Sequence, residues 1–399
     1  MPVELKKFNN IISVTLLLLI LNNYFLISIG FFNILLKINT IFFFITIIYF
    51  YLKNFKNNLA LKIYFLLILL ICFGTVAGAW DLRSSYLFHA KRIFFDQSLY
   101  SAFDNYADFS HNDYPLLLHA FSASFAHLTG YWHEVFPKSA YTFVYLPPLI
   151  FLYSYMNNKK YLILLSLLIF FLGPHLFDCR IDGVVALYFT TSAYCFYNIF
   201  FLKNNEGYKG TFYFMTFLIS STLPLIKNEG FVLLILIFLV TVFLKFFEKE
   251  LLVNLKKIST LSLSFTPFVL WKFFCFENGI TNTDFTLILL RENLTSRLLD
   301  LDNYNLFFDY LFISNEKIIV VLLFFLVSFY LNFNKKLFIY TTLLFFSYSA
   351  LLLIVYFSTP HDLTYHLHTS ASRVTRSLSL MLGIFSLYNL NIYALKESS

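Results

Sequence analysis

The sequence predicts an all-α, polytopic membrane protein with about twelve transmembrane spans. Of its 399 residues, 59% are apolar and only 13% are charged, whereas a typical soluble domain is about 25% charged. Its mean hydropathy is +0.71, and its apolar runs are long rather than alternating, which excludes an outer-membrane barrel. These observations also exclude a soluble globular enzyme, a disordered chain and a coiled coil.

A span requires roughly 20 mostly apolar residues, so the chain has room for about 10 to 13 of them. The expected spans are 11–32, 38–52, 61–79, 141–156, 161–174, 183–202, 211–226, 231–247, 258–276, 316–331, 337–357 and 377–394. Lysine-rich connectors mark the cytoplasmic side by the positive-inside rule. These connectors are 53–62, 157–160, 203–210, 245–257 and 332–336. Both termini then lie inside, and residues 1–399 form one integral membrane domain.

This topology places every aspartate, histidine and arginine on the outer side or at an outer span end. Arginine binds phosphate and carboxylate, aspartate acts as a base or a metal ligand, and histidine titrates near neutrality. We therefore expect any chemistry to face outward. The net charge of +7 fits cytoplasmic lysines and indicates no nucleic-acid partner. The four scattered cysteines match neither a disulfide framework nor a zinc site.

The largest outer loop, 80–140, opens with Trp80 and Asp81. The spacing predicts an amphipathic helix over 81–96 on the membrane surface, with its polar face toward a cavity. That polar face consists of Asp81, Ser85, His89, Arg92 and Asp96. A second helix is expected near Pro115, where Asp113 either caps the helix or serves the site. Asp81 is either a span-end acid beside an interfacial tryptophan or a functional carboxylate.

Three further outer segments carry charge. Lys227 and Glu229 lie in a tight Lys-Asn-Glu-Gly turn, which is either a simple hairpin or part of a cavity mouth. Arg180 lies between two acids, one of which is Asp182, and a local ion pair there has little value. The last outer loop, 358–376, carries two arginines that bind either a substrate phosphate or ordinary anionic lipid. These arginines are Arg373 and Arg376. The histidines of this loop match no standard zinc spacing, so no metal site is predicted.

Taken together, these motifs resemble the GT-C glycosyltransferases, which use polyprenyl-phosphate-linked sugars, and in particular their mannosyltransferase and aminoarabinose transferase type. Asp81 heads the long outer loop, and the turn His-Asn-Asp-Tyr-Pro precedes an apolar helix at 111–120. The Lys-Asn-Glu-Gly turn occupies 227–230, and Ser-Arg-Val occupies 372–374. The resemblance covers about residues 60–376 and rests on the order and common sidedness of these motifs.

The resemblance implies an inverting transferase that moves a hexosyl or pentosyl unit, with Asp81 as the general base. Arg373 would stabilise the leaving lipid phosphate, with Arg376 and Lys227 behind it. The remaining residues would line the substrate site, and they are His111, Asp113, Tyr114, Arg180, Asp182 and Glu229. Some family branches use the early aspartate as a metal ligand, so a divalent cation is the one cofactor left open.

The partners implied are a polyprenyl-phosphate sugar donor, membrane lipid, and a glycan, lipid or protein acceptor. The expected location is the bacterial inner membrane, with the site on the periplasmic face and a role in cell-envelope polysaccharide synthesis. Two alternatives stay open. A transporter or flippase would place ionisable groups near the bilayer midplane on broken helices. A glycan polymerase or ligase would transfer a whole chain instead of one sugar.

Overall fold

Every element of the described part of the chain is helical, as the sequence predicts. The computed structural model describes residues 3–55, 81–100, 110–155, 164–165, 167–168, 181–202, 209–280 and 287–397. Up to residue 262 the elements are α1 (Val3–Ser28), α2 (Ile34–Phe55), η1 (Leu82–Tyr86), α4 (Leu87–Asp96), α5 (Leu117–Thr129), α6 (Val135–Phe143), α7 (Leu146–Tyr155), α9 (Ile181–Phe201), α10 (Lys209–Ile226), α11 (Asn228–Phe247) and α12 (Leu251–Ser262). The rest are η4 (Leu263–Phe265), α13 (Thr266–Glu277), α14 (Leu287–Leu298), α15 (Leu301–Phe308), η5 (Asp309–Ile313), α16 (Glu316–Leu331), α17 (Lys335–Ser358) and α18 (Leu363–Glu397).

Eight of the described helices are long and apolar enough to cross a membrane. The number is nine if the bent pair formed by α15–η5 and α16 counts as one span. Helix α10 is apolar but shorter. The expected span 61–79 and most of 161–174 lie outside the described residues, and the other expected spans each overlap one of these helices. The chain is thus a multi-pass helical membrane protein, and the count of twelve stays a prediction.

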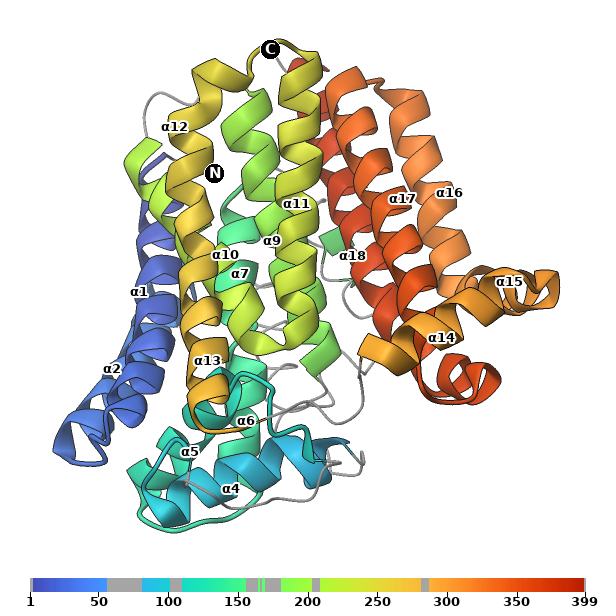
Figure 1. Ribbon diagram of the computed structural model, residues 1–399. Coiled ribbons are helices and arrows are strands. Elements are labelled where there is room, and N and C mark those ends of the chain that lie inside the picture. The colour runs from blue at the N-terminus through green and yellow to red at the C-terminus, as the bar shows by residue number, and fades with distance from the viewer. Residues whose placement is uncertain are drawn as a thin grey trace.

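Helix α9 lies at the centre of the bundle, and all of its residues are buried. It packs against α10, α11 and α18, as Figure 1 shows. Among its buried tyrosines, Tyr188 donates a hydrogen bond from its hydroxyl to the carbonyl of Val144 at 3.1 Å. The Tyr340 hydroxyl on α17 donates to the carbonyl of Ala193 at 3.1 Å. Such bonds offset the cost of burying hydroxyl groups in an apolar core.

Helices at the margin of the bundle expose apolar side chains, as expected for surfaces that contact lipid acyl chains. Phe42 on α2 is 54% exposed, and Leu252 and Phe276 on the α12–α13 segment are 84% and 79% exposed. In water such surfaces would be an aggregation hazard. Their placement therefore supports a bundle that is surrounded by membrane.

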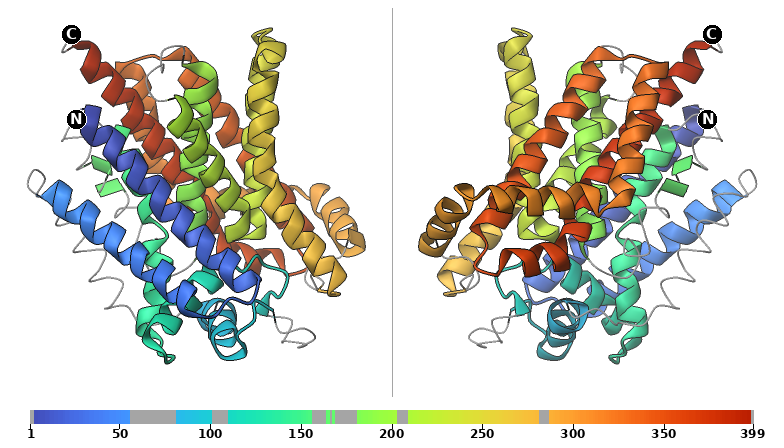
Figure 2. Two further views of the ribbon diagram at one scale, coloured as in Figure 1. Left: turned by 90° about the vertical axis from the view of Figure 1, so that its left-hand side faces the viewer. Right: turned by 90° about the vertical axis from the view of Figure 1, so that its right-hand side faces the viewer.

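The bundle has two distinct ends (Figures 1 and 2). Both chain termini lie toward one end, where the α11–α12 connector also lies, and we name it the terminal end. Helices α4 and α5 lie at the opposite end, which we name the site end. An even number of crossings places both termini on one side, which agrees with the predicted topology.

The predicted helix over 81–96 is present, but its polar face is not open. Residues 82–86 form a π-helical turn, and α4 continues to Asp96. Ser85, His89 and Arg92 are buried, and the His89 ring nitrogen Nε2 lies 2.9 Å from the carbonyl of Ser110. The expectation that this face lines a cavity is wrong for these three residues, because α5 and the segment before it cover them.

The predicted last outer loop is largely helical. Helix α18 begins at Leu363 instead of residue 377, so both arginines of this segment lie inside the helix. Its polar residues resemble a loop in the sequence, but Thr375 and Arg376 are buried in the bundle. Arg297 on α14 fixes the short link before α18, since its guanidinium donates to the carbonyls of Thr359 at 2.8 Å and His361 at 2.9 Å.

Candidate functional site

The acid at the start of the first outer segment contacts the arginine of the last helix. Asp81 directly precedes η1, and its carboxylate accepts a hydrogen bond from Nη1 of Arg373 on α18. The two residues are 292 positions apart in the chain. Their side chains are 30% and 22% exposed, so the pair is reachable from solvent but largely enclosed. Both were expected in the site, and the structure brings them into direct contact.

Asp182 connects this pair to a second cation. It lies in the first turn of α9, where a carboxylate is favoured by the helix dipole. Its Oδ2 lies 3.7 Å from Nε of Arg373, and its Oδ1 lies 3.3 Å from Nζ of Lys227. The Asp182 side chain is only 9% exposed. A carboxylate buried to this degree requires such partners.

Lys227 lies between α10 and α11 and extends this group of ion pairs to one more carboxylate. Its ammonium contacts Glu229 at 2.7 Å. Burial alone would lower the pKa of Lys227, but Glu229, Tyr114 and Asp182 together raise the pKa well above its ordinary value. The side chain therefore stays an ammonium. We name the set Asp81, Arg373, Asp182, Lys227 and Glu229 the ion chain.

Gly230 explains how Lys227 can lie so close to the core. A Cβ atom at this position would lie 2.1 Å from the carbonyl oxygen of Leu223 in α10. Only glycine lets the start of α11 approach the end of α10 this closely. The Lys-Asn-Glu-Gly sequence is thus a closely packed turn that holds two charged side chains at the site end.

Asp113 forms a second polar group next to the ion chain. Helix α5 begins at Leu117, with Leu116 at its N-cap position, so the capping role considered for Asp113 is wrong. Instead, Oδ2 of Asp113 accepts hydrogen bonds from Nδ2 of Asn228 at 2.7 Å and from Nζ of Lys272 at 3.1 Å. Trp271 Nε1 donates to the Asp113 carbonyl at 3.0 Å. Helix α13 therefore anchors the loop that carries Asp113.

His111 and Tyr114 lie in the same loop. Their rings stack at 4.7 Å, and His111 has a left-handed backbone with φ of 54°. The Lys227 ammonium lies 5.7 Å from the centre of the Tyr114 ring, within the range of a cation–π contact. Through Tyr114, the loop is thus in contact with the ion chain.

Most of the residues predicted for the site converge at one end of the bundle. Arg180 lies outside the described residues. Arg376 is buried three residues after Arg373 and contributes to the charge around Asp182. Among the described residues, no group of three His, Cys, Asp or Glu side chains is placed to hold a metal ion. The arrangement therefore offers a carboxylate that can accept a proton, held among cations that can stabilise an anion.

Sequence reasoning missed three contributors, namely Asn228, Trp271 and Lys272. One signal pointed to Lys272, because it is a charged residue within the otherwise apolar run 258–276. Such a residue in a span usually has a partner at the site. Its partner, Asp113, is 159 positions away, and no local pattern indicates this pairing.

Comparisons of the chain with protein-family models, with curated proteins and with solved structures gave no match.

Proposed function

We propose that the chain is a membrane glycosyltransferase of the GT-C type that takes a sugar from a polyprenyl-phosphate donor. The observation that carries this proposal is the contact between Asp81 and Arg373, which joins the beginning of the first outer segment to the last helix. It pairs a base with a phosphate-binding cation at one site, as transfer from a phosphate-linked sugar requires. The full twelve-span GT-C fold, a bacterial inner-membrane location and a periplasmic site belong to the same proposal.

The reaction balances with the residues of the ion chain and Arg376. The acceptor hydroxyl gives its proton to the carboxylate of Asp81, and its oxygen attacks the anomeric carbon. The bond between that carbon and the phosphate oxygen breaks, and the phosphate leaves with the electron pair. Arg373, Lys227 and Arg376 stabilise the charge that develops on the phosphate. Attack opposite the leaving group inverts the anomeric centre.

The other polar groups position the substrates in this proposal. Asp113 and Glu229 accept hydrogen bonds from sugar or acceptor hydroxyls, and each already lies beside a lysine. His111 and Tyr114 present a stacked aromatic surface, which is suited to the apolar face of a sugar ring. The acceptor is a glycan, a lipid or a protein segment at the membrane surface.

A transporter is the second candidate, because one span is broken. The segment α15–η5 and helix α16 meet at 69°, and broken helices hold the substrate in many transporters. The ion chain, however, lies where α9 and α11 begin, instead of at mid-bundle. A transporter site is expected near the bilayer midplane, so this position favours surface chemistry.

The experiment compares cells that lack the gene with cells complemented by wild type or by Asp81→Asn. Mass spectrometry of surface glycans and lipid-linked sugars is the measurement. We expect one sugar to disappear on deletion, its lipid donor to accumulate, and Asp81→Asn to lower transfer by about 100-fold or more. The matched control is Asp302→Asn, an exposed carboxylate on α15, which should restore the sugar fully.

Two outcomes would contradict the proposal. If Asp81→Asn, expressed at the wild-type level, complements fully, then Asp81 is a span-end acid without a catalytic role. Transport would then be the better interpretation. Loss of a complete polymer without accumulation of a single-sugar donor would instead indicate a polymerase or ligase.

A further inference from the structure

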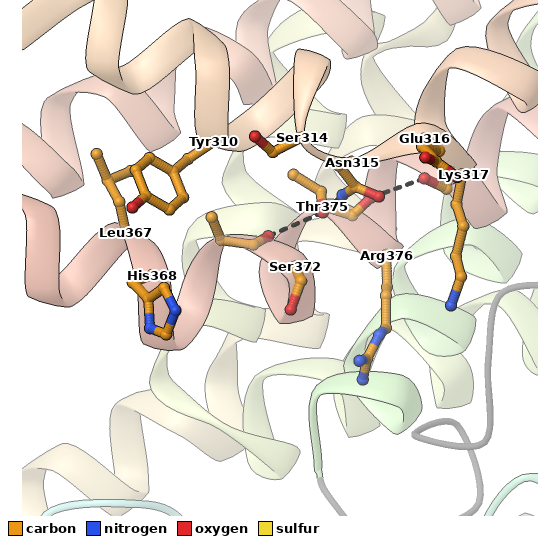
Figure 3. A pocket seen from close by; sticks show the side chains of 12 residues that line it. Tyr310, Ser314, Asn315, Glu316, Lys317, Leu367, His368, Ser372, Thr375 and Arg376 are labelled. Atoms are coloured by element: carbon orange, nitrogen blue, oxygen red, sulfur yellow. Dashed lines mark hydrogen bonds between the residues drawn. The ribbon is translucent and has the colours of Figure 1, made fainter.

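A polar cavity lies along α18, the helix that also carries Arg373. Its volume is about 320 Å³, and it is an open cavity lined by the junction of η5 with α16 and by α18. Figure 3 shows its lining, which includes Asn315, Glu316, Lys317, Ser372, Thr375 and Arg376. None of the roles proposed above except the one for Arg376 uses these residues.

Basic and hydroxyl groups gather on one side of this cavity. In Figure 3 the Arg376 guanidinium and the Lys317 ammonium extend in the same direction, and Ser372 and His368 point the same way. The carboxylate of Glu316 also lines the cavity and lies in Figure 3 beside the start of the Lys317 side chain, above the Lys317 ammonium. Arg376 is only 5% exposed, so its charge acts in a medium that screens little. A tetrahedral oxyanion matches this set, since guanidinium, ammonium and hydroxyl groups can each donate to its oxygens.

The bend between η5 and α16 contributes to the same cavity. Asn315, at the N-cap position of α16, donates from Nδ2 to Oγ1 of Thr375 on α18 at 2.6 Å. This bond fixes the start of α16, a helix of 16 residues, against α18. The positive end of its dipole therefore lies at the cavity and favours an anion there.

The ion chain has more carboxylates for each basic group than the cavity has. Arg373 already contacts two carboxylates, from Asp81 and Asp182. Across the ion chain and the Asp113–Lys272 pair, four carboxylates face three basic groups. The cavity instead has two basic side chains against one carboxylate.

Exposed apolar residues lie close in sequence to two lining residues of the cavity, Tyr310 and Ser314, and favour a ligand that carries a lipid chain. Ile313 and Phe308, on η5 and α15, are 67% and 50% exposed. Both precede the bend that forms the cavity, so an acyl or isoprenoid chain could follow them while its headgroup enters beside α16. We propose that this cavity binds the phosphate headgroup of a membrane lipid, with Arg376 and Lys317 as its principal contacts. Its use as the donor phosphate site rests on the proposed function, whereas the binding itself does not.

The test measures binding to the purified full-length protein in an uncharged detergent, so that it requires no transfer activity. The probes are dihexanoyl phosphatidic acid, uncharged dihexanoylglycerol and inorganic phosphate, titrated by calorimetry. We expect the phosphatidic acid to bind and the other two to bind at least tenfold more weakly. Lys317→Ala should weaken phosphatidic acid binding by about tenfold, equivalent to about 1.4 kcal/mol, and Arg376→Ala by more.

Lys317 is exposed, so its variant tests the proposal even if Arg376→Ala fails to fold. Lys335→Ala, at the start of α17, is the control and should bind as wild type does, while Lys317→Arg should retain most of the affinity. The proposal is overturned if Lys317→Ala binds as tightly as wild type, or if dihexanoylglycerol binds equally well. Inorganic phosphate binding as tightly as the lipid would overturn the lipid assignment. Asp81→Asn should retain binding, which separates this proposal from the proposed transfer chemistry.

Discussion

Two ionic clusters lie at the two ends of the bundle, and they are built from different parts of the chain. At the terminal end, Lys245 contacts Glu248 at 2.5 Å and Glu250 at 2.8 Å, and Lys336 contacts Glu248 at 2.7 Å. Three of these four residues are close neighbours in the chain, since Lys245 lies in the last turn of α11 and the two glutamates follow in the α11–α12 connector. At the site end, the ion chain joins residues from four separate segments, and its most distant pair is 292 positions apart.

The carboxylate that joins two cations differs in exposure between the clusters. The side chain of Glu248, which contacts Lys245 and Lys336, is 25% exposed, whereas that of Asp182, which contacts Lys227 and Arg373, is 9% exposed. Exposed ion pairs contribute little free energy, and buried charges carry a desolvation cost. The terminal-end cluster is thus a group of ion pairs formed mainly between close neighbours in the chain, at the turn between α11 and α12. The ion chain is costly to assemble, which is the reason to assign it a function.

The largest effect is expected from Asp182→Asn. The substitution leaves two buried cations, Lys227 and Arg373, without their shared carboxylate, and removing one partner of a buried pair costs about 3–5 kcal/mol. The matched change at the terminal end, Glu250→Gln, should cost less than about 1 kcal/mol, because the Glu250 side chain is 45% exposed and Lys245 keeps Glu248 as a partner. Denaturant titration in mixed micelles gives both free energies of unfolding. Equal losses of unfolding free energy in the two variants would mean that the two clusters do not differ in their contribution to stability.

The two ends should also respond to acid in different pH windows. Burial lowers the pKa of His89 from 6.5 to about 4, with Arg92 and His111 adding to the decrease. The unfolded chain then binds a proton that the folded chain does not, so stability falls as the pH drops from 6.5 towards 4. The loss at pH 4 is on the order of 3 kcal/mol. Burial also lowers the pKa of the neighbouring His119, which adds to the effect.

At the terminal end, hydrogen bonds from Lys245 and Lys336 outweigh burial and lower the pKa of Glu248. Its contribution is therefore present above pH 4.5 and is lost only below that value. Hydrogen exchange, corrected for its intrinsic pH dependence, should show α4 and α5 opening between pH 6.5 and 4 while the α11–α12 connector stays protected. Simultaneous loss of protection at both ends would refute this separation.

Much of the helical order could be predicted because it depends on local patterns. Long apolar runs require backbone hydrogen bonds to be satisfied internally, so each run forms a helix whatever its neighbours are. The first part of α18 is the instructive failure. Residues 363–376 contain histidine, threonine, serine and arginine, which local propensity assigns to a loop. Contacts with α17 and α16 hold this stretch instead, since the hydroxyls of Tyr356 and Ser370 lie 2.8 Å apart and Asn315 donates to Thr375 at 2.6 Å.

The membership of the site could be predicted in part, because topology places polar groups on a common side. Which of these residues contact one another could not be predicted. The contacts of Asp81 with Arg373 and of Asp113 with Lys272 depend on how α13 and α18 cross the bundle, and a single sequence carries no signal of such crossings. The burial of His89 is also a tertiary effect, since its spacing alone placed it on an open polar face.

A smaller effect tests whether the turn at the site end is under tight steric control. Gly230→Ala places a methyl group 2.1 Å from the Leu223 carbonyl oxygen, and overpacking of this kind costs about 1–3 kcal/mol. Gly210→Ala, in the first turn of α10 with no atom within 4 Å, is the control and should be neutral or slightly stabilising. Thermal unfolding of the two variants checks the difference. If neither variant changes the unfolding temperature, the close approach of α10 and α11 does not determine which residue position 230 can hold.

The smallest effect is expected where each end has a non-glycine residue in left-handed backbone. Lys249 at the terminal end has φ of 57°, and His111 at the site end has φ of 54°. Lys249→Gly relieves strain at a helix C-terminus and should stabilise by about 0.5–1 kcal/mol. His111→Gly relieves the same strain but loses the stack on Tyr114, so it should gain less or be destabilised. Unfolding free energies measure both, and an equal gain would mean that the His111 stack contributes nothing to stability. In that case the aromatic pair at the site end would be available to bind a substrate without any cost to the fold.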